Sequence, residues 1–248
     1  MKILTVIGLS GSGKTTVIEN LIKELKKRGH SVGTIKHIHY EKFQMDTPGK
    51  NTYRHRQAGA DTVVARGEAE TDILYYRGDM NIYDILSHFR EDFVIMEGVR
   101  DAVAPEIVVC TENDTPKISP LTLAVSGRYA NNDIKEYKGV PVVNALTDIE
   151  RLADMILEKV PQMFYDFDKE CCGVCGHDCK GFLAQVLKGK RQASECVLKE
   201  SDISLKIDNK EIPLVPFVRN ILKNAVLGVV KELKGYKENA QIEIKLKK

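Results

Sequence analysis

The chain has 248 residues, of which 43% are hydrophobic and 29% charged, and its formal net charge at neutral pH is +2. This is ordinary for a soluble globular protein with one substantial core and room for a second, smaller unit. No arginine-rich patch with interleaved aromatic residues is present, and no apolar run approaches the ~20 residues that span a bilayer, so we predict neither a nucleic-acid partner nor a membrane segment.

The first predicted element is a strand over 3–9, a continuous apolar run typical of a strand buried on both faces. This run is too short for a signal peptide, so we expect a cytoplasmic protein, in which clustered cysteines indicate metal rather than disulfides. An amphipathic helix follows the strand, and Gly29 is placed to end it.

The segment between this strand and helix reads G-x-x-x-x-G-K-T, the pattern of a phosphate-binding loop. Its glycines let backbone N–H groups surround phosphate oxygens, and the helix N-terminus adds partial positive charge. Lys14 is placed to reach the β- and γ-phosphates, and Thr15 to offer its hydroxyl to Mg²⁺. The predicted phosphate-binding residues are Gly8, Ser10, Gly11, Ser12, Gly13, Lys14, Thr15 and Thr16.

A second strand is predicted over 31–38, and a helix is predicted to begin near Asp46, with Pro48 in its first turn. Two roles for Asp46 stay open: it either caps this helix or reaches Mg²⁺ from a loop. The basic side chains of the helix likewise either bind phosphates of a second ligand or form a solvated face.

The next part of the chain alternates strands with a short helix over 81–88 and a longer one over about 148–159, capped at Asp148. The predicted strands are 61–67, 72–77, 93–98, 106–110, 121–127 and 140–145. This alternation predicts an α/β fold, here a P-loop NTPase domain with a largely parallel sheet.

A second acid on the Mg²⁺ side is expected at the end of another buried strand. Glu97 follows four apolar residues and precedes Gly98, so it is the candidate; it would hold Mg²⁺ through water or orient an attacking water. The alternative is an ordinary surface carboxylate. No N-K-x-D element for guanine is present, and by position the nearest substitutes are Asn144 and Asp148.

Three segments of the chain, "GLSGSGKTT", "VGTIKHIHYEKFQMDTPGKNTYRHRQAGA" and "FVIMEG", closely resemble the molybdopterin-guanine dinucleotide biosynthesis protein B (MobB) family. The resemblance covers about residues 1–160. It implies a GTP-binding, weakly hydrolysing accessory protein, usually a homodimer. Its partner would be the molybdopterin guanylyltransferase that attaches GMP to molybdopterin, or a downstream assembly protein of molybdoenzymes. By position, Gly8 to Thr16 would hold the phosphates, Glu97 would be the Walker-B-like acid, and Asp46 lies in the family's signature block.

The composition shifts near Val160, and four cysteines follow. Their pattern is Cys172-x2-Cys175-x3-Cys179-x16-Cys196. Four thiolates suit tetrahedral zinc or an iron–sulfur cluster, and the solitary fourth cysteine disfavours a zinc ribbon. The segment also resembles the small four-cysteine 4Fe–4S domain of electron-transfer and one-carbon enzymes. That resemblance implies a 4Fe–4S cluster. Zinc stays open as the runner-up and reduced structural thiols as the third possibility.

We therefore predict three parts: a MobB-like GTP-binding domain over 1–160, a four-cysteine domain over 161–200, and a hairpin–helix–strand extension over 201–248. The last two together would form a small α+β metal-binding extension. Two other functions stay open from the sequence. One is a P-loop kinase of a small metabolite, weakened by the absence of an arginine-rich lid motif. The other is an iron–sulfur scaffold whose nucleotide site switches partner docking.

Overall fold

The computed structural model describes residues 1–40, 43–76, 78, 80–164, 175–196, 203–207, 210–212, 214, 216–238 and 241–244. The chain divides into two compact units, Met1–Tyr165 and Asp166–Lys248. The finer boundaries expected at residues 160 and 200 stay predictions. In the described residues, no helix combines the length and the apolar composition needed to cross a membrane.

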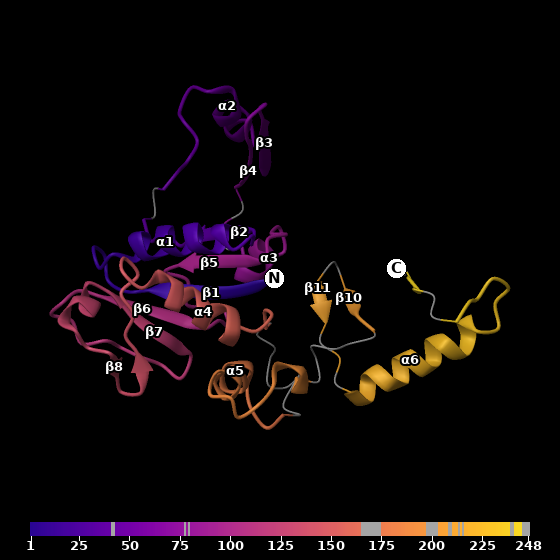
Figure 1. Cartoon of the computed structure of the whole chain (residues 1–248). Coiled ribbons are helices and arrows are strands. Elements are labelled where there is room, and N and C mark those ends of the chain that lie inside the picture. Colours follow the sequence, from indigo (N-terminus) through magenta and orange to yellow (C-terminus); the bar gives the residue numbers. More distant parts are fainter. Residues whose placement is uncertain are drawn as a thin grey trace. The chain divides into compact units, whose positions relative to one another are not determined.

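The first unit is built on a five-stranded sheet with the strand order β2-β5-β1-β6-β7 (Figure 1). Its strands are β1 (Lys2–Ile7), β2 (Val32–Lys36), β5 (Phe93–Glu97), β6 (Glu106–Cys110) and β7 (Thr122–Gly127). Every neighbouring pair in this sheet is parallel. The predicted α/β fold with a largely parallel sheet is therefore confirmed.

Helices cover both faces of this sheet, because each strand alternates its apolar side chains between them. On one face, α1 (Lys14–Lys27) and α4 (Ile149–Lys159) pack against side chains such as Leu4. On the other face, α3 (Ile82–Leu86) packs against Ile3 and its neighbours. Each fully buried leucine or isoleucine of such a core contributes about 1.5–3 kcal/mol.

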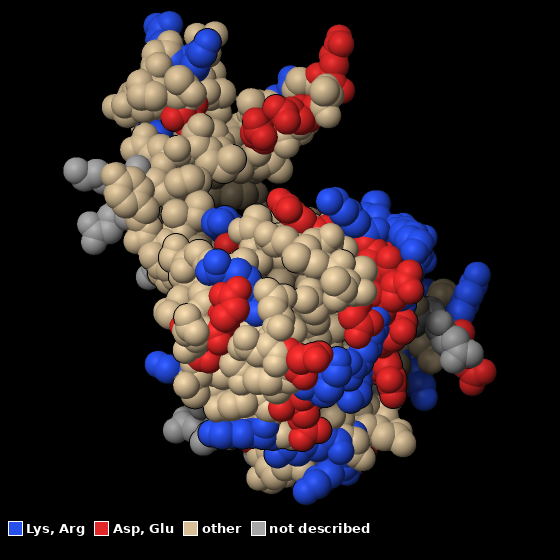
Figure 2. Space-filling model, turned by 60° about the vertical axis from the view of Figure 1, so that its left-hand side comes forward, with Lys and Arg blue, Asp and Glu red and all other residues tan. Residues whose placement is uncertain are grey.

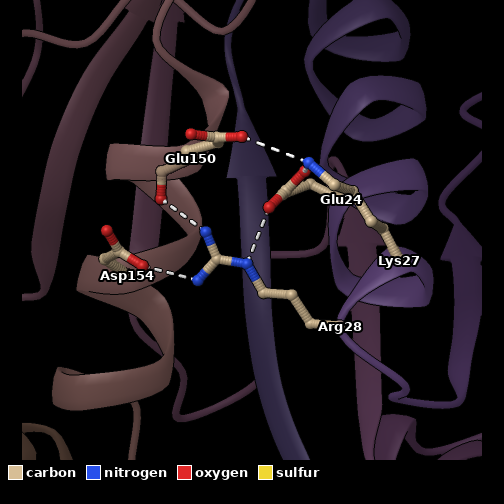
Figure 3. Close-up of polar contacts among 5 residues, drawn as sticks. All are labelled: Glu24, Lys27, Arg28, Glu150 and Asp154. Atoms are coloured by element: carbon tan, nitrogen blue, oxygen red, sulfur yellow. Dashed lines mark hydrogen bonds and ion pairs between the residues drawn. The ribbon is translucent and has the colours of Figure 1, made fainter.

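A polar clamp joins α1 to α4 on one face of the sheet (Figure 3). Arg28 donates to Asp154 Oδ1 at 2.5 Å, to Glu24 Oε1 at 2.7 Å and to the Glu150 carbonyl oxygen at 3.1 Å. Lys27 donates to Glu150 Oε1 at 3.2 Å. The Glu24 side chain is nearly buried, and its hydrogen bond from Arg28 lowers its pKa, an effect that outweighs the opposing effect of burial.

The segment between β2 and α3 forms a separate arm, made of α2 (Asn51–Gln57), β3 (Thr62–Arg66) and β4 (Thr71–Tyr75). Both predicted strands exist, but they pair antiparallel with each other and not with the parallel sheet. The helix begins at Asn51, later than predicted, because Gly49 has a φ of 87° that a helix cannot include.

The far side of β7 is extended by short elements. After β7 come the 3₁₀ helix η1 (Arg128–Asn132) and a small hairpin of β8 (Glu136–Tyr137) and β9 (Val140–Pro141). Of the strand predicted over 140–145, only the first two residues form a strand, although Val142 still makes a parallel bridge to Val125.

The second unit contains its own short elements. They are α5 (Cys179–Leu187), η2 (Ala193–Glu195), β10 (Leu205–Ile207), β11 (Lys210–Ile212) and α6 (Pro216–Val230). The predicted hairpin is confirmed as β10 and β11, and so is a last helix beginning at Pro216. Residues 241–244, the described part of the predicted final strand, form no strand, since an alternating segment needs a paired neighbour.

Candidate nucleotide-binding site

The phosphate-binding loop lies where β1 ends and α1 begins, at the carboxyl edge of the parallel sheet. Gly11 and Gly13 have φ values of 73° and 99°, conformations that glycine adopts without a steric penalty. A Cβ on Gly8 would lie 2.1 Å from the carbonyl oxygen of Val109 in β6, so only glycine fits there. Sheet and loop are therefore in direct contact.

Two polar side chains of the loop have distinct surroundings. The Lys14 ammonium donates to the carbonyl oxygens of Leu9 at 2.7 Å and Gly8 at 3.1 Å, which places it over the loop. Ser12 is fully buried, and its hydroxyl has no hydrogen-bond partner in the described part of the chain.

Three elements bring Thr15, Glu97 and Lys36 together beside this loop. The Thr15 hydroxyl lies 3.4 Å from Glu97 Oε2, and the Lys36 ammonium lies 3.1 Å from Glu97 Oε1. The Glu97 side chain is 15% exposed. A hydroxyl and a carboxylate are the hard oxygen donors that Mg²⁺ prefers, so the donor set fits that ion.

The sequence alone does not single out Lys36 as a residue of this site. Its signal lies in the sheet order, because Lys36 is directly opposite Glu97 in the parallel register of β2 and β5. That register becomes visible only once the two strands are known to be neighbours.

Asp46 lies in the arm, and none of its described contacts joins it to the phosphate-binding loop. Its carboxylate accepts hydrogen bonds from the Thr52 hydroxyl at 2.8 Å, the Tyr76 hydroxyl at 3.0 Å and the Thr47 N–H at 2.9 Å. Partial burial alone would raise the pKa of Asp46, but these hydrogen bonds and the charge of Arg56 outweigh it and lower the pKa. These contacts are those of an anchoring residue of the arm.

Three of the four predicted metal ligands lie within the described residues; Cys172 lies outside them. Cys175, Cys179 and Cys196 are half-buried and form no disulfide. Cys179 is the first residue of α5, and the preceding Asp178 caps this helix by accepting from the Gly181 N–H at 2.7 Å. Across the described ranges, no group of three or more His, Cys, Asp or Glu side chains is arranged to hold a metal ion.

Comparison with known proteins links this geometry to a family. The family model described as "Molybdopterin guanine dinucleotide synthesis protein B" (MobB) matches residues 3–125. A putative molybdopterin-guanine dinucleotide biosynthesis adapter protein of Methanocaldococcus jannaschii is 31% identical, over 99% of this chain and 97% of the relative. The chain belongs to the MobB family.

Other members of the MobB family match only part of this chain. The adapter protein of Haemophilus influenzae is 33% identical over 51% of this chain and 75% of its own length. The crystal structure of Bacillus subtilis MobB is 26% identical, with a TM-score of 0.53, and the match covers 65% of this chain and 99% of that chain. The second unit is thus shared with the M. jannaschii relative but lies largely outside the match to B. subtilis MobB.

Proposed function

We propose that this chain is a GTP-binding accessory protein of molybdenum-cofactor or tungsten-cofactor biosynthesis that assists the attachment of GMP to molybdopterin. Membership of the MobB family supports the pathway. The contact of Thr15 with Glu97 beside the phosphate-binding loop is the observation that supports nucleotide binding. The proposed partner is the molybdopterin guanylyltransferase or a downstream molybdoenzyme assembly protein.

The chemistry of the site supports binding more than fast hydrolysis. The loop N–H groups and Lys14 would hold the β- and γ-phosphates, and Thr15 and Glu97 would hold Mg²⁺, which neutralises phosphate charge when bound. Glu97 already accepts from both Lys36 and Thr15, so it is placed to hold a cation rather than to take a proton from water. We therefore propose that GTP turnover is slow.

Lys14→Ala tests the nucleotide site. We expect GTP affinity in the presence of Mg²⁺ to fall at least about 100-fold, because the main cationic donor to the phosphates is removed. Calorimetric titration measures this, and Lys23→Ala, an exposed lysine on the same helix, is the matched control. Failure of the unaltered protein to bind GTP with Mg²⁺ would overturn the proposed function.

We also propose that Cys172, Cys175, Cys179 and Cys196 hold a 4Fe–4S cluster, with zinc as the alternative occupant. The thiolate donor set suits either metal, and the three described cysteines are half-buried thiols that form no disulfide. Anaerobic purification with iron, sulfide and zinc analysis tests the proposal. Cys175→Ser should lower the metal content, whereas Cys110→Ser, in the buried core of the first unit, should not. Zinc without sulfide would favour the alternative, and absence of both metals would contradict a metal site.

A homodimer is the third part of the proposal. Val64 and Ile73 lie directly opposite each other in the arm and are 55% and 52% exposed. An isolated two-stranded sheet is marginally stable, so a second copy that covers this apolar pair would stabilise the arm. Val64→Lys should give a monomer in sedimentation equilibrium, and Ile244→Lys, at an exposed isoleucine of the second unit, should not. A monomeric unaltered protein would contradict this part.

A further inference from the structure

The sheet order gives the bound nucleotide a direction along the carboxyl edge. β5, which carries Glu97, is on one side of β1, and β6 and β7 are on the other. Thr15 and Glu97 mark the side of the terminal phosphates and Mg²⁺. The nucleoside of a triphosphate held by this loop therefore extends toward the ends of β6 and β7, where ligands of parallel sheets bind.

The turn after β7 is in contact with the phosphate-binding loop. A Cβ on Gly127 would lie 3.0 Å from the Ser12 carbonyl oxygen, and Gly127 has a φ of 82°. The next residue, Arg128, donates to the Gly11 carbonyl oxygen at 3.4 Å and lies 3.6 Å from Glu112 Oε2. Its guanidinium is thus held beside the loop, with 56% of the side chain exposed. A planar cation in this position is suited to stack on a base.

Asn131 shares the face of η1 that carries Arg128. Side chains at i and i+3 of a 3₁₀ helix eclipse one another, so these two residues point the same way. Tyr129, between them in sequence, is 8% exposed and packs in the core, which anchors the turn. The exposed face of η1 therefore presents a guanidinium followed by an amide.

Backbone hydrogen bonding fixes which way the amides point. The Leu146 N–H donates at 2.9 Å to an Asn144 side-chain atom, which must be Oδ1 because only an oxygen accepts. Asn144 Nδ2 then donates at 3.0 Å to Asn131, which must offer its own Oδ1. This leaves Asn131 Nδ2 as an outward donor, with no partner in the described part of the chain.

We propose that the base of the bound nucleotide lies over Arg128, and that the linked amides of Asn131 and Asn144 read it as guanine. Guanine presents the O6 acceptor to the Asn131 Nδ2 donor, whereas adenine presents an amino donor at the same position. The remaining lone pair of Asn144 Oδ1 is available to the N1–H of guanine. This inference rests on the proposed nucleotide binding. It adds a source of guanine specificity, which an N-K-x-D element would otherwise provide and which this sequence lacks.

Titration of the full chain with GTP and with ATP, both with Mg²⁺, tests the assignment. The unaltered protein should prefer GTP. Asn131→Ala and Asn144→Ala should each weaken GTP about 10-fold to 100-fold and leave ATP unchanged. Arg128→Ala should weaken both nucleotides by the same factor. Asn224→Ala, an exposed asparagine of α6, is the control and should change neither affinity.

The outcomes separate the two proposals. If the unaltered protein binds neither nucleotide, the proposed function fails. If it binds GTP and ATP equally, or if Asn131→Ala keeps the GTP preference, nucleotide binding stands and the base assignment is overturned. If only Asp148→Asn lost the preference for GTP over ATP, the base would be recognised at the start of α4, and the base assignment would also be overturned. Asn131 is exposed, so its variant keeps the test valid even if Asn144→Ala fails to fold.

Discussion

Gly127, the last residue of β7, lies against both the phosphate-binding loop and the neighbouring strand β6, and only the absence of a side chain allows this. A Cβ at this position would lie 2.6 Å from Val109 Cγ1 and 2.7 Å from the Cys110 carbonyl oxygen. Real Cβ atoms do not approach backbone oxygen so closely, so a larger residue would force the turn away from β6. The position of Arg128 depends on this close approach.

Gly127→Ala should lower the free energy of unfolding by about 2–4 kcal/mol, since strain at positive φ adds to overpacking. Urea unfolding measures the loss. Gly139→Ala is the matched control: its φ of 81° is nearly the same, but nothing lies within 4 Å of the added Cβ. That variant should lose only about 1–2 kcal/mol. Equal losses of unfolding free energy in the two variants would mean that the close contact with β6 adds nothing to the cost of the Gly127→Ala substitution.

The clamp between α1 and α4 is the clearest polar feature at the scale of whole elements (Figure 3). Arg28 reaches from the end of α1 to Asp154 and to the Glu150 carbonyl oxygen, both in α4, while it also binds Glu24. The two helices pack on the same face of the sheet, so the clamp fixes their ends relative to each other. Its contribution depends on the ionisation of Glu24.

Glu24→Gln should therefore destabilise the protein in a pH-dependent way. The pKa of Glu24 is lowered in the folded state, chiefly by the hydrogen bond from Arg28. A lowered carboxyl pKa gives stability that is fully present above the ordinary pKa and is lost as the pH falls through the folded value. The stability gap between the unaltered protein and Glu24→Gln should be widest near neutral pH, begin to narrow below the ordinary glutamate pKa of about 4.3, and close once the pH is below the lowered folded-state pKa.

Urea unfolding at several pH values measures this gap. Glu158→Gln, at an exposed glutamate of α4, is the control and should show little gap at any of these pH values. If the stability gap for Glu24→Gln stayed constant down to acidic pH, the loss of stability would come from packing rather than from charge.

The inner strands of the parallel sheet, β1, β5 and β6, could be predicted from the sequence because burial on both faces leaves continuous apolar runs. The run that ends at Glu97 and the loop that ends at Thr15 were both recognised, and the structure brings these two residues together. Lys36 lies at the carboxyl edge of the sheet beside Glu97 because β2 and β5 are neighbours in the strand order. Arg128 lies at the same edge because the end of β7 contacts the phosphate-binding loop. These are long-range relations that local periodicity does not encode.

The arm illustrates the same limit. Its two strands have a clear local pattern, but the pattern does not specify the partner of a strand, and they pair with each other instead of joining the main sheet. The sequence leaves Asp46 open between a cap and a Mg²⁺ ligand because its partner Tyr76 lies 30 residues further along the chain. Placing it required the tertiary structure.

Positive and negative side chains are nearly balanced in number over the whole chain. On the face that Figure 2 shows, lysine and arginine side chains lie next to aspartate and glutamate side chains, mainly on the right-hand and lower parts of the view, and much of the rest is uncharged. This face agrees with the balanced net charge of +2.

The hydrophobic clusters of the first unit are made entirely of its own residues. Its three hydrophobic clusters draw their residues from positions 1–163, so removal of 166–248 deletes none of them. The structure of B. subtilis MobB matches 99% of its own length to only 65% of this chain, so a related fold exists largely without the second unit. The nucleotide site and the proposed cysteine site should therefore be separable.

A chain shortened to residues 1–165 should melt cooperatively and bind GTP within about 2-fold of the full chain, because every residue assigned to the nucleotide is retained. It should contain no iron, since all four proposed ligands are removed.

In the full chain, Lys14→Ala should lose GTP binding and keep iron, and Cys175→Ser should lose iron and keep GTP binding. Calorimetry and iron analysis on the same samples measure both properties. A shortened chain that folds but no longer binds GTP would place part of the nucleotide site in the second unit, and loss of both properties in either single variant would show that the two sites are coupled.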